Sequence, residues 1–260
     1  MDLEQKLKIL VNKLSTGHFD EVIFEATYLN KKHPKLEVFY NLLSLGYQGK
    51  GEYEKSIDLL ENALKKSKNN INFLNNLGLS YYKKKEYNPA EKYFQKVLEI
   101  KPNYINTLNN LAALYEEINH VEKSEDLLKK SIKINSEVIE TNYNLASLLQ
   151  SIGKFDEAKI YYKKILKLDE NFTKADRGIA MLEKYNSSND HIKIMEKKIK
   201  EEKLHKSNIV DLSFALGKVY EDVKDYEKSF FYISKANKLK KSLLNYNIEN
   251  DKKLFQKIKN

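Results

Sequence analysis

Apolar residues recur along most of this chain at spacings of three and four, which places them on one face of a helix. Between residues 71 and 100 two such stripes follow each other, first Leu74, Leu77 and Tyr81, then Phe94 and Val97. Each stripe is wide enough to need a partner surface. The pattern therefore predicts two consecutive amphipathic helices that pack against each other as a hairpin.

The hairpin pattern returns with a fixed period of 34. Three segments align without gaps, namely FLNNLGLSYY from Phe73, TLNNLAALYE from Thr107 and TNYNLASLLQ from Thr141. A period of this length is typical of stacked helical repeats, in which one hairpin cannot cover its own apolar face. Five consecutive units are expected over 3–172 (3–36, 37–70, 71–104, 105–138 and 139–172), and a further unit over 210–243.

The unit at 71–104 shows most clearly which kind of repeat this is. Its signature positions are Leu74, Leu77, Gly78, Tyr81, Tyr87, Ala90, Phe94, Val97 and Pro102. This set resembles the tetratricopeptide repeat (TPR) family, with Leu74 where Trp is commonest. The resemblance implies an all-α fold, a right-handed TPR superhelix (α-solenoid) of antiparallel helix pairs with about six to seven repeats. Small residues such as Gly78 are expected to let the second helix of the hairpin approach closely.

Residues 173–209 depart from the regular frame. Residues 172–185 predict one helix, and the run 186–189 (NSSN) interrupts it. Asp190 is expected to cap a second helix that carries Ile192, Met195 and Ile199. We expect a degenerate helical hairpin here, and a C-terminal connector with a capping helix over 244–260.

Asparagine recurs on the first helices of the units, which by the TPR resemblance line an inner, concave wall. Packing does not require Asn in mid-helix, where its propensity is mediocre. The pattern resembles the asparagine ladder of O-GlcNAc transferase, whose amides hold an extended peptide backbone. The candidate peptide-binding residues are Asn41, Asn75, Asn76, Tyr82, Asn109, Asn110, Glu116, Tyr143, Asn144 and Gln150.

Composition offers a second explanation for this ladder. The chain holds 27 Asn, and 45 of its 46 basic residues are Lys, with Arg177 the single Arg. A surplus of Lys and Asn is also what an AT-rich genome produces, so both explanations stay open. The net charge of +9 is expected to lie mainly on solvated helix faces. A basic surface that binds nucleic acid is the less favoured reading, and no nucleic-acid partner is expected.

We expect a non-catalytic scaffold that binds a peptide or protein segment. A second resemblance covers the C-terminal part, from Arg177 to about Ile258, which is similar to the region before the catalytic domain of bacterial TPR-sulfotransferase proteins. That likeness implies the alternative of a substrate-recruiting module whose catalytic domain lies beyond residue 260. No phosphate-cradling glycine loop, metal-ligand spacing or catalytic constellation is found, and the chain has no Cys, so no enzyme activity, cofactor or metal is expected.

The cellular location is predicted from the N-terminal sequence and from the absence of long apolar stretches. The segment MDLEQKLKILVNKL is charged and amphipathic, without the apolar core of a signal peptide. No stretch approaches 18 uncharged apolar residues, so no membrane span is expected. A cytoplasmic protein without a membrane partner is the prediction, and the oligomeric state is left open.

Overall fold

The described part of the chain is built from helices alone. The computed structural model describes residues 2–201, 204–244, 252, 255 and 256. Its helices are α1 (Leu3–Ser15), α2 (Phe19–Lys32), α3 (Val38–Gly49), α4 (Tyr53–Leu64), α5 (Ile71–Lys83), α6 (Tyr87–Ile100), α7 (Ile105–Glu117), α8 (Val121–Ile134), α9 (Ile139–Ser151), α10 (Phe155–Leu168), α11 (Thr173–Leu182), α12 (Asp190–Lys198), α13 (Lys206–Asp222) and α14 (Tyr226–Leu243). These are seven successive pairs, so the predicted all-α class with six to seven repeats is confirmed for the described residues.

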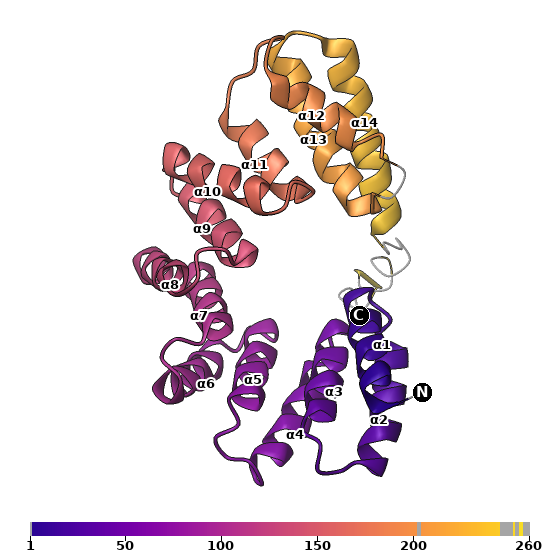
Figure 1. The fold of residues 1–260 in the computed structure, drawn as a ribbon, viewed down its shortest axis with the longest axis vertical. Helices are drawn as coiled ribbons and strands as arrows, with labels where there is room; N and C mark the ends of the chain where they lie inside the picture. The colour runs from indigo at the N-terminus through magenta and orange to yellow at the C-terminus, as the bar shows by residue number, and fades with distance from the viewer. Residues whose placement is uncertain (1, 202–203, 245–251, 253–254, 257–260) are drawn as a thin grey trace. The chain divides into compact units, whose positions relative to one another are not determined.

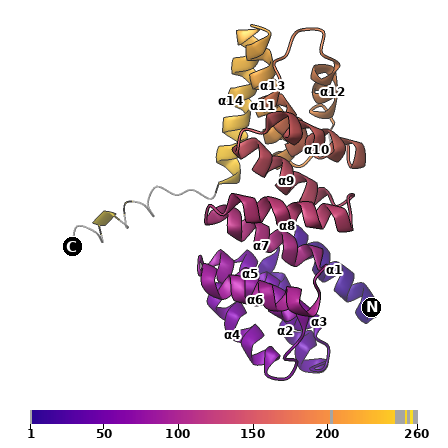
Figure 2. The same cartoon turned by 90° about the vertical axis from the view of Figure 1, so that its left-hand side faces the viewer.

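The chain divides into two units, residues 1–136 and 137–260, and each is described by itself. The first unit holds α1–α8 and the second α9–α14. Within each unit, consecutive helices pack on each other, as α13 and α14 do along their lengths in Figure 1 and as α5 and α6 do in Figure 2. In the first unit the first helices of neighbouring pairs also touch, so α3 contacts α5 and α5 contacts α7.

Close packing inside a hairpin depends on a small residue in its first helix. A Cβ atom built on Gly78 would lie 2.7 Å from Cε1 of Phe94, which is fully buried on the second helix of the same pair. In the last pair, a Cβ on Gly217 would lie 2.6 Å from Cγ1 of Ile233. Carbon atoms do not approach this closely, so the expected role of the small position is borne out by these contacts.

The turn inside each regular hairpin has one residue with positive φ, and this position recurs with the same period as the apolar stripe. It is filled by Gly17, Gly51, Lys85, Asn119, Gly153 and, in the last pair, Lys224, with φ between 61° and 81°. A left-handed residue ends the first helix, because it turns the chain away while its N–H still reaches a helix carbonyl. The repeat thus fixes backbone conformation as well as the apolar stripe.

The pair α11–α12 differs from the regular hairpins. Its first helix ends at Leu182, before Tyr185, and the second helix is capped by Asn189, whose side chain accepts from the N–H of His191. The expectation that Asp190 is the cap is therefore wrong by one residue, since Asp190 is already in the first helical turn.

A buried ion pair ties α12 to α11. The carboxylate of Asp176 is fully buried and accepts from Nζ of Lys198 at 2.9 and 3.0 Å. Nε2 of His191 lies 2.9 Å from the same carboxylate, and the hydroxyl of Tyr185 lies 2.6 Å from Nδ1 of His191. These polar contacts join α11 to α12. The expected C-terminal capping helix falls on 244–260, which lies almost wholly outside the described residues.

Candidate functional site

In the first unit, the candidate residues lie on the first helices of three consecutive hairpins. Asn41 is on α3, Asn76 on α5 and Asn110 on α7, and all three side chains are half-buried. Because α3, α5 and α7 pack side by side, these amides come together although they lie far apart in sequence. The repeat period accounts for this placement.

The amides form a hydrogen-bonded row, which we call the amide row (Asn41, Asn76, Asn75 and Asn110). Nδ2 of Asn110 donates to Oδ1 of Asn75 at 3.1 Å, and Nδ2 of Asn76 donates to Oδ1 of Asn41 at 3.2 Å. Between them, Nδ2 of Asn75 lies 3.4 Å from Oδ1 of Asn76. A carboxamide has two donor hydrogens and two acceptor lone pairs, so the row leaves part of this capacity unused.

Asn75 and Asn109 lie deeper than the other amides. Asn75 is 6% exposed and Asn109 is 3% exposed. Oδ1 of Asn75 also accepts from the Thr107 hydroxyl at 2.7 Å, which links α5 to the start of α7. Asn75 therefore supports the neighbouring helix, and the accessible amide surface of the row belongs to Asn41, Asn76 and Asn110.

Tyr82 and Glu116 lie in the last turns of α5 and α7. The ring of Tyr82 is half-buried, 6.3 Å from the ring of Tyr87. Burial and the nearby Glu117 carboxylate raise the pKa of the Tyr82 phenol, so it stays a neutral donor. Partial desolvation and the charge of Glu117 raise the pKa of Glu116. This part of the surface is acidic and aromatic, in contrast to the neutral amide row.

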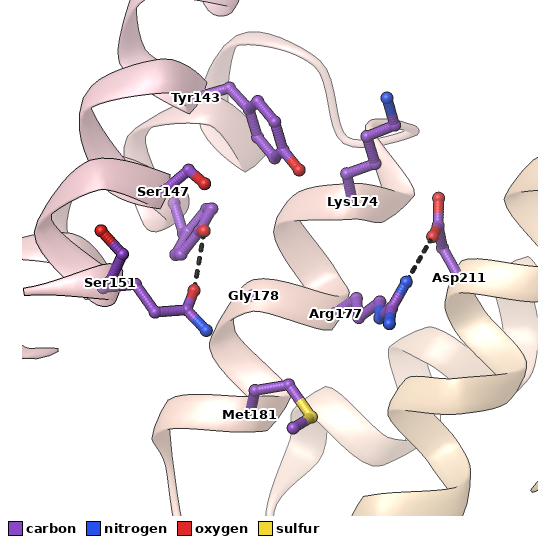
Figure 3. Close-up of a pocket in the computed structure, with 10 residues that line it drawn as sticks. Tyr143, Ser147, Ser151, Lys174, Arg177, Gly178, Met181 and Asp211 are labelled. Carbon is purple, nitrogen blue, oxygen red and sulfur yellow. Dashed lines mark hydrogen bonds and ion pairs between the residues drawn. The ribbon is translucent and has the colours of Figure 1, made fainter. Parts of the chain in front are cut away.

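The second unit holds an open pocket that we call the Arg177 pocket, with a volume of about 490 Å³. Its lining comes from α9, α10, α11 and α13, and Figure 3 shows how these side chains converge. The lining residues are Tyr143, Ser147, Gln150, Ser151, Tyr162, Lys174, Arg177, Gly178, Met181 and Asp211. Two predicted residues, Tyr143 and Gln150, are thus brought together here. The third, Asn144, is half-buried on α9 but does not line the pocket.

Aromatic packing builds one side of the Arg177 pocket. The ring of Tyr143 lies 6.1 Å from that of Tyr162, and the Tyr162 hydroxyl donates to Oε1 of Gln150 at 2.9 Å. A Cβ on Gly178 would lie 2.5 Å from the Tyr162 ring, so this ring rests directly on the α11 backbone. Burial is the main cause that raises the pKa of both phenols, which keeps them protonated donors at neutral pH.

Two cationic side chains, Lys174 and Arg177, also line this pocket. Arg177 is 44% exposed and lies 3.4 Å from the carboxylate of Asp211, while Nζ of Lys174 lies 5.6 Å from the centroid of the Tyr143 ring. Asp211 also accepts from the Thr173 hydroxyl at 3.4 Å. Both contacts to Asp211 are long and therefore weak. The pocket thus presents more donors than acceptors and suits a polar or anionic group.

Lys174, Arg177 and Asp211 line the pocket but were not among the predicted site residues. For Arg177 a signal existed, since Asn109, Tyr143 and Arg177 follow one another at the repeat period. Continuing the period through α11 would have placed Arg177 on the same helix position. Asp211 follows Arg177 by the same 34 residues, but the irregular segment before the last unit shifts the frame, so Asp211 lies at a different position of its helix. Among the described residues, no cluster of His, Asp or Glu is arranged to hold a metal ion.

The comparisons identify the repeats. Family models described as tetratricopeptide repeat match residues 71–104, 105–138, 139–172 and 210–243, and a model described as TPR repeat matches 47–85. Together these matches cover more than half of the 260 residues. No curated protein matches the chain.

Solved structures show the same fold at low sequence identity. A thermophilic TPR protein of Thermus thermophilus, TTC0263, is 17% identical, with a TM-score of 0.63, over 69% of this chain and 98% of its own. The Pseudomonas aeruginosa pilF protein is 20% identical, with a TM-score of 0.59, over 84% and 96%. A tetratricopeptide repeat protein of Parabacteroides merdae is 17% identical, with a TM-score of 0.54, over 99% and 98%. In the described part of the present chain, no helix combines the length and the apolar character that crossing a membrane requires.

Proposed function

Since the chain belongs to the tetratricopeptide repeat family, we propose that it is a non-catalytic scaffold that binds an extended peptide or protein segment along the first helices of its hairpins. The TPR fold supports this function in general, because such repeats serve protein interaction. The amide row supports the mode of binding. Asn144 and the Arg177 pocket provide a proposed contact surface of their own in the second unit.

The single observation that carries the proposal is the accessible amide row. Asn41, Asn76 and Asn110 present carboxamides whose spare donors and acceptors match the N–H and C=O groups of a peptide main chain. Helices pack roughly 8–10 Å apart and an extended chain rises about 3.3 Å per residue. One amide per hairpin then meets about every third residue of the bound segment, whatever its side chains are.

The energetics imply weak and sequence-tolerant binding by the row. One neutral hydrogen bond contributes about 0.5–1.5 kcal/mol net. Selectivity would come from the flanking groups, Tyr82 and Glu116 in the first unit and the Tyr143 and Arg177 side chains in the second. The donors of the Arg177 pocket favour a polar or acidic side chain in a segment bound there.

A peptide-library experiment tests the amide row. Replacing both Asn76 and Asn110 by Ala removes two carboxamides, and we expect peptides to bind about 5- to 100-fold more weakly. Affinity is measured by fluorescence anisotropy on the peptides that the unmodified protein selects. Thermal unfolding of the variant is followed in parallel, because Asn76 and Asn110 also bond to Asn41 and Asn75.

The control is Asn88→Ala combined with Asn237→Ala, which removes two exposed amides from second helices. It should leave peptide affinity unchanged. Equal affinity of both double variants would refute a role for the amide row, and a library without any binder would refute the scaffold itself.

The sulfotransferase alternative gains no support from the comparisons, which name TPR proteins. It stays a prediction, and reading the coding sequence past codon 260 tests it directly. The cytoplasmic location likewise stays a prediction.

A further inference from the structure

A second cavity lies in the first unit, away from the amide row, and we call it the lysine pocket. Its volume is about 760 Å³. The lining comes from the α2–α3 connection, from α3 and α4, from the α4–α5 connection and from the start of α5. The lining residues are Pro34, Lys35, Glu37, Tyr40, Leu59, Asn62, Ala63, Lys65, Lys66, Ser67 and Phe73.

The floor of the lysine pocket is apolar and well packed. Phe73 is 1% exposed and Ala63 is 7% exposed. The Tyr40 ring lies 5.9 Å from the Phe73 ring at an angle of 59°, and half-buried Leu59 completes the floor. Small-molecule sites are cavities of about 300–1,000 Å³ with mostly apolar walls and a few polar groups. The floor alone therefore suits an aliphatic or aromatic body.

The rim is cationic. Lys35, Lys65 and Lys66 line it, and Lys65 donates to Oδ1 of Asn62 at 2.8 Å. The side chains of Lys35 and Lys66 are exposed and have no hydrogen bond or ion pair with any residue that the structure describes. Two ammonium groups at the mouth of an apolar cavity attract an anionic head group.

The one carboxylate of the lining does not neutralise these lysines. Oε1 of Glu37 accepts from the Ser67 hydroxyl at 2.8 Å, and Oε2 accepts from Nδ2 of Asn70 at 2.7 Å. Both carboxylate oxygens are thus engaged in joining the two connections on either side of the hairpin. These neutral donors leave the charge of Glu37 in place, but the three lysines outnumber it, so the lining of the pocket has a net positive charge.

We propose that the lysine pocket binds a small amphiphilic anion, with the apolar body on Tyr40, Leu59 and Phe73 and the anionic head between Lys35 and Lys66. This function goes beyond the proposed scaffold role, because none of the lining residues belongs to the amide row. The class of ligand follows from the combination of an apolar floor and a rim with a net positive charge.

Octanoate and 1-octanol are the test probes, because they share an apolar chain and differ in the charge of the head. Binding to the full chain is measured by titration calorimetry, with assigned NMR shifts to locate the site. We expect octanoate to bind at least fivefold more tightly than octanol and to shift the signals of Leu59, Ala63 and Phe73.

Two variants separate the rim from the floor. Lys35→Gln with Lys66→Gln should reduce octanoate affinity to that of octanol, whereas Lys130→Gln with Lys133→Gln on exposed positions of α8 should change nothing. Ala63→Phe should weaken both ligands by filling the cavity, with folding checked by circular dichroism. The proposal is overturned by absent octanoate binding, by equal losses in the two lysine variants, or by shifts that map elsewhere. None of these outcomes tests peptide binding by the amide row, so the two proposals can fail independently.

Discussion

At the scale of single residues, the turn inside each regular hairpin has one residue with a positive φ, whatever its side chain. Gly17, Gly51 and Gly153 adopt this conformation at little cost. The other three are not glycine: Lys85 has φ 66°, Asn119 has φ 61° and Lys224 has φ 64°. A left-handed conformation brings Cβ of a non-glycine residue close to the following carbonyl oxygen. Asn tolerates it better than Lys does, because its short polar side chain can bond to the local backbone. Lys85 is therefore a strained position in an otherwise regular turn.

The prediction at this scale is that Lys85→Gly stabilises the chain by about 0.5–1 kcal/mol, since the relief of strain exceeds the added entropy of the unfolded chain. Asn119→Gly at the equivalent turn should give a smaller gain. The free energy of unfolding, from urea denaturation followed by circular dichroism, measures both. A loss of stability in Lys85→Gly would show that the turn does not strain this residue.

At the scale of the helical element, the interior of a hairpin depends on matched sizes at two positions, one on each of its helices. The 71–104 repeat pairs Gly78 with Phe94, and the next repeat has Ala112 and Leu128 at the same two positions. Between these two repeats, the larger residue on the first helix accompanies the smaller one on the second. The two positions thus act as one packing unit.

Gly78→Ala should therefore destabilise by about 1–3 kcal/mol through overlap with Phe94, although Ala is the better helix former. Adding Phe94→Leu should restore part of that stability, because the pair then has the composition of the 105–138 repeat. A double-mutant cycle in thermal or urea unfolding measures the coupling, which we expect to be favourable by about 0.5 kcal/mol or more. Additive effects of the two changes would contradict the packing unit.

The repeat period also marks how far sequence reasoning reaches. It predicted the helical hairpins and placed Asn41, Asn76 and Asn110 on adjacent first helices, because a regular repeat fixes which faces meet. It did not predict the Arg177 pocket, which depends on the Tyr162 ring resting on Gly178 and on a carboxylate arriving from a helix with shifted register. The buried ion pair between α11 and α12 was also missed, since charged residues are expected at the surface. Contacts that do not recur from repeat to repeat produce no periodic pattern in the sequence, so they cannot be predicted from it.

At the scale of the whole molecule, tyrosines contribute much of the packing, and burial is the main cause that raises their pKa. Tyr81, Tyr115, Tyr162, Tyr185 and Tyr220 all show this shift, and for Tyr115 burial and its hydrogen bond to Glu91 raise the pKa to about 12. A raised pKa means that the folded state holds the phenol proton more tightly than the unfolded state. Below about pH 10, the ordinary pKa of tyrosine, these phenols contribute fully to the free energy of unfolding. That contribution is lost as the pH rises toward 12.

We therefore expect stability to fall steeply in alkali, by about 1 kcal/mol for each of these tyrosines between pH 10 and pH 11. The unfolded fraction, measured by circular dichroism, and the absorbance of tyrosinate should increase together in this pH range. Tyr115→Phe should make the alkaline slope shallower, whereas Tyr226→Phe, on a ring that is 66% exposed, should not. A melting temperature that is constant from pH 9 to pH 11 would contradict this picture.

The amide row has one more consequence, which concerns direction. Asn110 donates to Asn75 and Asn76 donates to Asn41, so both bonds between helices run toward the N-terminal repeat, and within α5 Asn75 donates to Asn76. Reversing the direction of these hydrogen bonds requires all four carboxamides to flip together. The row therefore has a defined hydrogen-bond polarity. A peptide backbone also has a direction, from its N-terminus to its C-terminus, and can lie along the row in either of two orientations. For the peptide that we propose binds along this row, the parallel and antiparallel orientations meet different sequences of donors and acceptors, so we expect one orientation to bind more tightly than the other.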